Sequence, residues 1–373
     1  IFPTGPVLHY LSPNIKVDVP TPAGYQTPTT NIDFFTFNEA IVDGSSGVAT
    51  NVPPPTVHNR VYVELQNRGR VDAADVQVMA VITNASAGLG LLPMGFTANV
   101  VAGTPLAGPD WTTLGVKHVT NLHAGFPQVV SFDLPSTVLP VPASLPGQSH
   151  YCLVAFLHSA QDPFTSTQRN VDLLTLSDRK VGQHNLHIVE FVGTPPPPGT
   201  GTGMWAMLNI NGSFEKKTAL IDLHIDSRRF PGTIQIVLPP SLAPTDPKKQ
   251  AKEFRTGSLK IVETWFQKHL PVAKRLFMEA KYPEAQYKAL VTAMQEVKKQ
   301  PPLVLQTGSA GAVRGLKMKD GDRSTLFLRI DPPRGAKVGS MWEFDVQQRD
   351  TQAGRLLGGS RYRVVVNRAL RGR

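Results

Sequence analysis

Residues 60–69 of the chain are RVYVELQNRG, and residues 74–82 are ADVQVMAVI. In the first stretch apolar residues alternate with polar ones, which is the period of a half-buried strand. Asn67-Arg68-Gly69 then supplies the residue types that favour a turn. We therefore predict an antiparallel strand–turn–strand unit, from which β-sandwiches are built.

The same pattern recurs on both sides of a Pro/Gly segment, GTPPPPGTGTG at 193–203. Four consecutive prolines predict a stiff spacer and the glycines a flexible one, so the domain boundary is expected at 194–203. Further strands are expected at 127–132, 150–156, 185–192, 204–210, 217–225, 233–238, 303–306, 324–330, 341–348 and 361–366. Asn211-Gly212 between two apolar runs predicts a hairpin. No helix-period stretch of useful length occurs in the first half.

The predicted fold class is mostly β, with two tandem immunoglobulin-like antiparallel β-sandwiches. Residues 1–57 would form an extended Pro/Thr-rich arm with an edge strand of the first sandwich, 58–193. The second sandwich, 204–373, would carry an α-helical insertion at about 247–300. Apolar residues at helical spacing over 258–280, divided by Pro271, and over 283–298 predict this insertion.

The net charge of +10 is unevenly distributed. Residues 1–199 contain 8 basic and 13 acidic residues, whereas residues 200–373 contain 30 basic and 15 acidic ones. Such asymmetry indicates an acidic partner for the basic half, or a surface that keeps the protein in solution. The insertion has 12 basic and 5 acidic residues, so it is either a candidate anion- or partner-binding surface or a cap on a sheet edge. The candidate residues are Lys248, Lys249, Lys252, Arg255, Lys260, Lys268, Lys274 and Arg275.

Two regions resemble bacterial immunoglobulin-like modules. The strand–turn–strand unit, together with residues 170–188, is similar to CARDB-like domains over about residues 55–193. Residues 335–367, with GSMWEFDVQQR at 339–349 and GGSRYRVVV at 358–366, resemble the closing strands of such modules. The resemblance implies extracellular modules for adhesion or spacing that are often appended to secreted enzymes, and it implies no catalytic residues.

No catalytic motif such as HExxH, Walker A or GxSxG is present. The single cysteine, Cys152, lies in an apolar run and is expected to be a small buried residue. The pairs His184/His187 and His118/His123 are candidate zinc ligands, but His184 and His187 would point to opposite faces of a strand. We therefore predict no metal or other cofactor, with calcium as the alternative.

Calcium would use oxygen donors at Asp320-Gly321-Asp322 or Asp43-Gly44-Ser45-Ser46, although Asp-Gly is more often a simple turn. Asp222, His224 and Asp226 alternate with apolar residues and should share one strand face. That face is expected to be solvated, with a general acid/base site as the alternative.

These features favour a non-enzymatic interaction or structural module on a bacterial surface or outside the cell, self-assembling or part of a larger protein. The chain begins at Ile1 rather than Met, which suggests a processed or trimmed product. The alternatives are binding of nucleic acid or acidic glycan through the basic second domain, and an accessory region of a secreted enzyme. No run of apolar residues is long enough for a membrane span. The expected partner is a protein or a second copy of the chain.

Overall fold

The computed structural model describes most of the strands and few of the long connections. The described residues are 8–18, 58–84, 89–106, 108, 110–135, 151–192, 204–211, 218–242, 244, 253–257, 302–319, 322–367, and isolated positions within 24–39 and 263–295. The chain divides into two compact units, which are described separately. Unit 1 comprises Ile1–Asn84, Leu89–Leu139 and Tyr151–Asn185, and unit 2 comprises Ala85–Gly88, Pro140–His150 and Leu186–Arg373.

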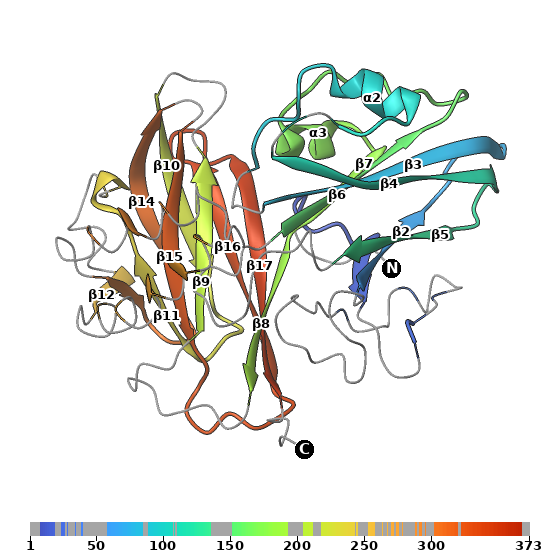
Figure 1. Ribbon diagram of the computed structural model, residues 1–373. Coiled ribbons are helices and arrows are strands. Elements are labelled where there is room, and N and C mark those ends of the chain that lie inside the picture. The colour runs from blue at the N-terminus through green and yellow to red at the C-terminus, as the bar shows by residue number, and fades with distance from the viewer. Residues whose placement is uncertain are drawn as a thin grey trace. The chain divides into compact units, whose positions relative to one another are not determined.

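Unit 1 is a sandwich of two sheets (Figure 1). One has the order β1-β2-β5, formed by β1 (Ile15–Asp18), β2 (His58–Leu65) and β5 (Gln128–Pro135). The other has the order β4-β3-β6-β7, formed by β4 (Trp111–Leu122), β3 (Ala73–Asn84), β6 (Tyr151–His158) and β7 (Val181–His184). Val61, Val63, Val78, Ala80 and Phe132 from both sheets meet in the core between them.

Two short helices cover the other face of the four-stranded sheet of unit 1. They are α2 (Phe96–Ala102) and α3 (Val171–Ser177), seen above the strands in Figure 1. Phe96 and Phe164 pack against Phe156 of β6, with ring centroids 5.8–6.1 Å apart. Since β3 is thereby buried on both faces, its sequence is an almost continuous apolar run.

Unit 2 is a second sandwich, and its two sheets have five strands each. The first, sheet F, has the order β14-β10-β16-β17-β8. Its strands are β14 (Ala310–Lys319), β10 (Thr218–Asp226), β16 (Met341–Asp350), β17 (Leu356–Asn367) and β8 (Leu186–Val192). The second, sheet E, has the order β12-β13-β11-β15-β9. Its strands are β12 (Phe254–Thr256), β13 (Leu303–Leu305), β11 (Thr233–Val237), β15 (Arg323–Asp331) and β9 (Met204–Asn211).

The core of unit 2 lies between these sheets and contains a stacked aromatic pair. The rings of Phe344 and Tyr362 are 4.8 Å apart and almost parallel, and Phe230 lies 5.4 Å from Phe344. The predicted fold class, mostly β with tandem sandwiches, is therefore confirmed.

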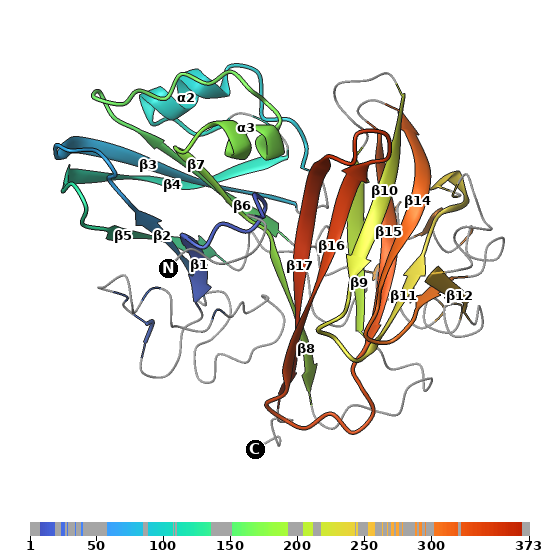
Figure 2. The same cartoon turned by 180° about the vertical axis from the view of Figure 1, so that it is seen from behind.

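The boundary between the units differs from the expected one at 194–203. Strand β8 precedes that segment, yet it pairs in parallel with β17 over seven residues, Leu186–Val192 with Arg361–Asn367. Figure 2 shows the two strands side by side. The last change of unit along the chain occurs between Asn185 and Leu186. Local sequence could not reveal this, because the pairing partner lies at the other end of unit 2.

The hairpin expected at Asn211-Gly212 is wrong. Strand β9, before this dipeptide, pairs with β15 in sheet E, whereas β10, after it, pairs with β14 and β16 in sheet F. The chain therefore passes from one sheet of the sandwich to the other between Asn211 and Thr218, so the two strands are not hairpin neighbours. Each strand buries its apolar face against the other sheet, which a two-stranded hairpin could not provide.

Only part of the expected insertion at 247–300 is described. Within it, β12 adds a short strand to sheet E. Isolated described positions such as Lys274, Arg275 and Val291 are helical. The rest of the segment lies outside the described residues, as does the segment 194–203.

Candidate functional site

A band of charged side chains lies on the outer face of sheet F, which we call the polar face. Ile221, Leu223 and Ile225 of β10 point into the core, so the alternate residues Asp222 and His224 face outward. The polar face comprises Asp222, His224, Glu253, Arg314, Glu343, Asp345, Gln347, Arg349, Arg361 and Arg363. The expected sharing of one face by Asp222 and His224 thus agrees with the structure, but Asp222 is not solvated, since it is only 6% exposed.

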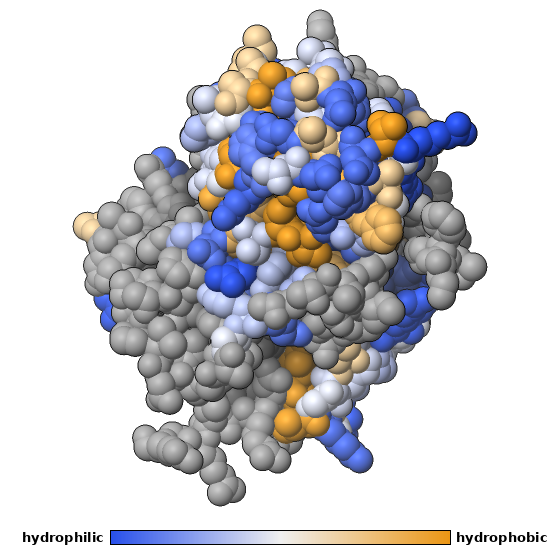
Figure 3. Space-filling view, turned by 90° about the vertical axis from the view of Figure 1, so that its right-hand side faces the viewer, coloured by the Kyte–Doolittle hydropathy of each residue, from blue (hydrophilic) through white to orange (hydrophobic). Residues whose placement is uncertain are grey.

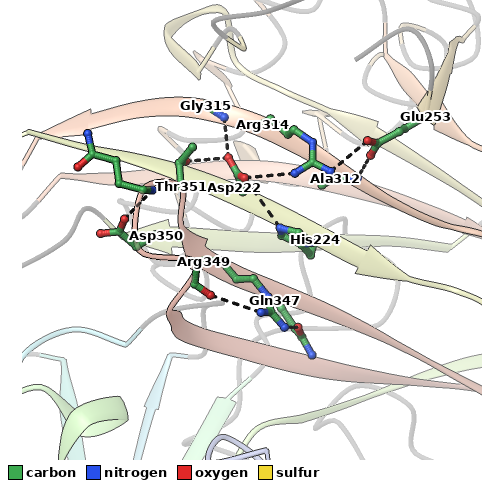
Figure 4. A network of polar contacts seen from close by, with 12 residues as sticks. Asp222, His224, Glu253, Ala312, Arg314, Gly315, Gln347, Arg349, Asp350 and Thr351 are labelled. Carbon is green, nitrogen blue, oxygen red and sulfur yellow. Dashed lines mark hydrogen bonds and ion pairs between the residues drawn. The ribbon is translucent and has the colours of Figure 1, made fainter. Parts of the chain in front are cut away.

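Asp222 is the centre of one half of the face (Figure 4). Its Oδ1 accepts hydrogen bonds from the backbone N–H of Gly315 at 2.8 Å and from Thr351 Oγ1 at 2.7 Å. Its Oδ2 lies 3.5 Å from Arg314 Nη1. One carboxylate therefore joins β14, β10 and the turn after β16.

The backbone contact to Gly315 depends on an irregularity between β10 and β14. The pairing register shifts between Ile221 and Leu223, and Gly315 has a φ of +66°. A β-bulge of this kind directs a group out of the regular ladder, and glycine adopts a positive φ without strain. The bulge thus turns a backbone donor toward the carboxylate.

Arg314 extends the network to the edge of the sheet. Its Nη2 donates to Glu253 Oε1 at 3.1 Å, and Glu253 Oε2 accepts the backbone N–H of Ala312. Glu253 therefore occupies a backbone donor of β14, the edge strand of sheet F. Covering an edge in this way limits pairing with other chains.

His224 is the half-exposed member of the network. Burial lowers the pKa of its imidazole, and the neighbouring Arg349 and Arg314 cations lower the pKa further, against the opposing effects of Asp222 and Glu253. Arg349 is held in place because its Nη2 donates to Gln347 Oε1 at 2.8 Å. These surroundings therefore favour the neutral form of the imidazole.

The geometry around His224 does not form a catalytic dyad. Its Nε2 lies 3.9 Å from Asp222 Oδ2, which is too long for a hydrogen bond, and Asp222 already accepts two others. A general base normally needs a partner that fixes its tautomer. The structure thus places the two residues of the acid/base alternative on one face without a hydrogen bond between them.

The other half of the polar face is a cross-strand ladder of ion pairs between β16 and β17. Arg361 donates to both carboxylate oxygens of Asp345 at 2.9 Å each. Arg363 donates to Glu343 at 2.9 Å, and Arg361 also lies 3.5 Å from Glu343. These side chains are only 19–26% exposed, so the neighbouring side chains restrict their movement. The face is charged but nearly balanced.

We expect the titration of His224 to report this environment. In histidine NMR spectra its midpoint should lie below that of an unfolded peptide. Arg349→Gln should raise the midpoint, because a cation is removed, and Asp222→Asn should lower it. As the folded pKa is depressed, protonation should destabilise unit 2 when the pH falls below the unfolded value. A midpoint unaffected by Arg349→Gln would contradict the proposed electrostatic coupling.

The basic surface expected on the insertion is described at three of its eight positions. Arg255 on β12 is exposed, as are Lys274 and Arg275, which are helical. Lys248, Lys249, Lys252, Lys260 and Lys268 lie outside the described residues. Of the three described residues, none is among the contacts of the network around Asp222.

The described histidines among the candidate zinc ligands each lie beside a different carboxylate. His118 Nδ1 lies 2.8 Å from Asp75 and His123 Nδ1 lies 2.8 Å from Asp72, both on the surface. His184 is buried, 3.1 Å from Glu39. Within the described part of the chain, no group of three or more His, Cys, Asp or Glu side chains is placed to hold a metal ion. The side chain of His187 is outside that part.

The remaining candidates from the sequence are the cysteine and the two clusters of oxygen donors. Cys152 is fully buried, as expected, and burial raises the pKa of its thiol well above the usual range. Such a thiol is unreactive. Of the two calcium candidates only Asp322 is described, and its carboxylate accepts the backbone N–H of Lys319, which is the geometry of a turn.

Comparisons with known proteins find no family model that matches the sequence and no matching curated protein. Solved structures with some likeness include red sea bream transglutaminase, with 11% identity and a TM-score of 0.17, covering 83% of this chain and 29% of that one. They also include the collagen adhesin of S. aureus, with 11% identity and a TM-score of 0.16, covering 84% and 87%. The CupB6 tip adhesin of Pseudomonas aeruginosa has 7% identity and a TM-score of 0.21, covering 83% and 89%.

Because every TM-score is below 0.5, these likenesses support no conclusion about fold or function. The class of the protein therefore follows from its own residues: it is a tandem β-sandwich protein with a charged outer face on one sheet. No helix among the described residues is long and apolar enough to cross a membrane.

Proposed function

We propose that the chain is a non-enzymatic interaction module, extracellular or on a bacterial surface, that contacts a partner protein through the polar face of unit 2. The observation that carries this proposal is the immobilised and balanced charge of that face. Preorganised charged groups lose little conformational freedom when a partner binds, and they favour partners with the complementary pattern.

The proposal is also supported by the contacts of Asp222. This carboxylate accepts hydrogen bonds from Gly315 and Thr351 and makes none to His224, so it stabilises the local structure instead of orienting the imidazole for proton transfer. A neutral, half-exposed imidazole can still donate and accept hydrogen bonds across an interface. This role suits recognition of polar groups.

A photo-crosslinking residue at Lys317 tests the proposal in an extract of the source organism. Lys317 is exposed on the outer side of β14, since its neighbours Leu316 and Met318 point into the core, and the contacts of the polar face do not use it. We expect one dominant protein adduct, which the double change His224→Ala and Arg349→Gln should reduce about tenfold, as for loss of a central polar contact. The matched control carries the same residue at Val338, which is exposed in the turn before β16. Identical adducts from both positions, or no adduct from Lys317, would reject the polar face as the binding surface.

Binding of nucleic acid or acidic glycan is the second candidate function. Exposed Arg255, Lys274 and Arg275 favour it. In that case heparin would compete for binding, affinity would fall steeply with salt, and substitution of these three residues by glutamine would weaken binding. The polar-face variants would then have no effect, which separates the two candidates.

A further inference from the structure

Two turns at one end of unit 1 form a second surface of unusual composition. They are residues 67–72 between β2 and β3 and residues 123–127 between β4 and β5, which we call the double-turn tip; both lie at the right-hand end of unit 1 in Figure 1. Phe126 is 69% exposed and Val71 is 72% exposed. Arg68 and Arg70, in the same turn as Val71, are exposed as well. Figure 3 faces this end and shows apolar surface among hydrophilic surface.

Asn67 forms hydrogen bonds with both turns. Asn67 Nδ2 donates to the carbonyl oxygens of Val71 and Leu122, at 2.9 Å each. The carbonyl oxygen of Asn67 accepts the N–H of Gly125, also at 2.9 Å. One residue thus fixes the backbone on both sides of the exposed apolar side chains.

Asp72 provides a second tie between the turns. Its Oδ1 accepts the backbone N–H of Ala124 at 2.9 Å, and its Oδ2 lies 2.8 Å from His123 Nδ1. The negative charge of Asp72 therefore interacts with Ala124 and His123 of the other turn. The guanidinium of Arg70 has no such carboxylate among the ion pairs of the described residues.

Apolar side chains stabilise a fold when they are buried, and Phe126 and Val71 are exposed. Their exposure is therefore better explained by binding than by stability. Rigid support does lower the entropic cost of binding. Two turns that present apolar side chains beside arginines are suited to a lipid surface, which offers acyl chains and phosphate groups together. A nucleic-acid strand stacking on Phe126 would leave Val71 without a role.

We propose that the double-turn tip is a peripheral binding site for anionic lipid surfaces. Phe126 and Val71 enter the boundary between headgroups and acyl chains, and Arg68 and Arg70 contact the phosphates. This site lies in unit 1 and is independent of the interaction proposed for unit 2.

Vesicle co-sedimentation of the full chain tests this site. With vesicles containing about 30% phosphatidylglycerol we expect salt-sensitive binding, and with pure phosphatidylcholine much less. Replacing Arg68 and Arg70 by glutamine should weaken binding about fivefold each. Phe126→Ser with Val71→Ser should weaken it about tenfold or more.

The matched controls are Leu176→Ser and Arg179→Gln, which remove an exposed apolar side chain and an exposed arginine elsewhere in unit 1. Neither control should alter binding by more than about twofold. Unchanged far-UV spectra and melting temperatures would show that the tip variants are folded. The proposal is overturned by absence of vesicle binding, by binding that the tip variants do not weaken, or by Phe126-dependent binding of oligo(dT) in place of vesicles.

Discussion

Replacing Asp222 by alanine is expected to lower the free energy of unfolding of unit 2 by about 3 kcal/mol. The carboxylate is buried and accepts hydrogen bonds from Gly315 and Thr351. Removing it leaves the buried N–H of Gly315 without its acceptor and Arg314 without one of its two carboxylates. An unsatisfied buried donor costs more than the net value of the bond that it formed.

Urea unfolding followed by tryptophan fluorescence would measure this loss. Asp222→Asn should cost about half as much, because the amide keeps an acceptor oxygen but loses the charge. The matched control is Asp226→Ala on the same strand, where Asp226 is partly exposed and paired with Arg228. That change should cost less than about 1 kcal/mol. Equal losses at Asp222 and Asp226 would show that the buried network adds nothing to stability.

The sequence predicted the parts of this fold whose pattern is local. Strand β2 alternates cleanly, and β3 and β6 are apolar runs bounded by turn residues, so their existence could be inferred. Strand β14, AGAVRGLKMK at 310–319, was not predicted, because glycines and a bulge interrupt its alternation. Helices α2 and α3 have only seven residues, which is too few for a periodic signal. They form because they pack on a sheet.

The site shows the same division between local and long-range information. The shared face of Asp222 and His224 follows from alternation along one strand. Their contacts with Arg314 and Arg349 require the strand order β14-β10-β16, which joins segments about a hundred residues apart. Charged residues alternating with apolar ones in 341–349 and 361–366 were the available sign of the ion-pair ladder. Only the register showed that Arg361 lies opposite Asp345.

Strand β8 leads to the second large prediction, which concerns fragments of unit 2. A fragment of residues 186–373 should be more stable than one of residues 204–373 by at least about 3 kcal/mol, counting the net value of several backbone hydrogen bonds. Without β8, strand β17 becomes the edge of sheet F, and its backbone loses partners over Arg361–Asn367. Tyr362, Val364 and Val366 of that strand belong to the core, so fraying there would expose apolar side chains.

A third fragment, residues 193–373, separates the strand from the Pro/Gly segment that follows it. If the pairing of β8 with β17 causes the difference in stability, the 193–373 fragment should unfold at the same urea concentration as 204–373. Both should unfold at a lower urea concentration than 186–373. If the Pro/Gly segment were the true boundary of the unit, all three fragments would be equally stable. Segments 85–88 and 140–150, which also belong to unit 2, are absent from all three fragments, so the comparison isolates β8. A strand that precedes the most conspicuous linker in the sequence would then be an integral part of the unit that follows it.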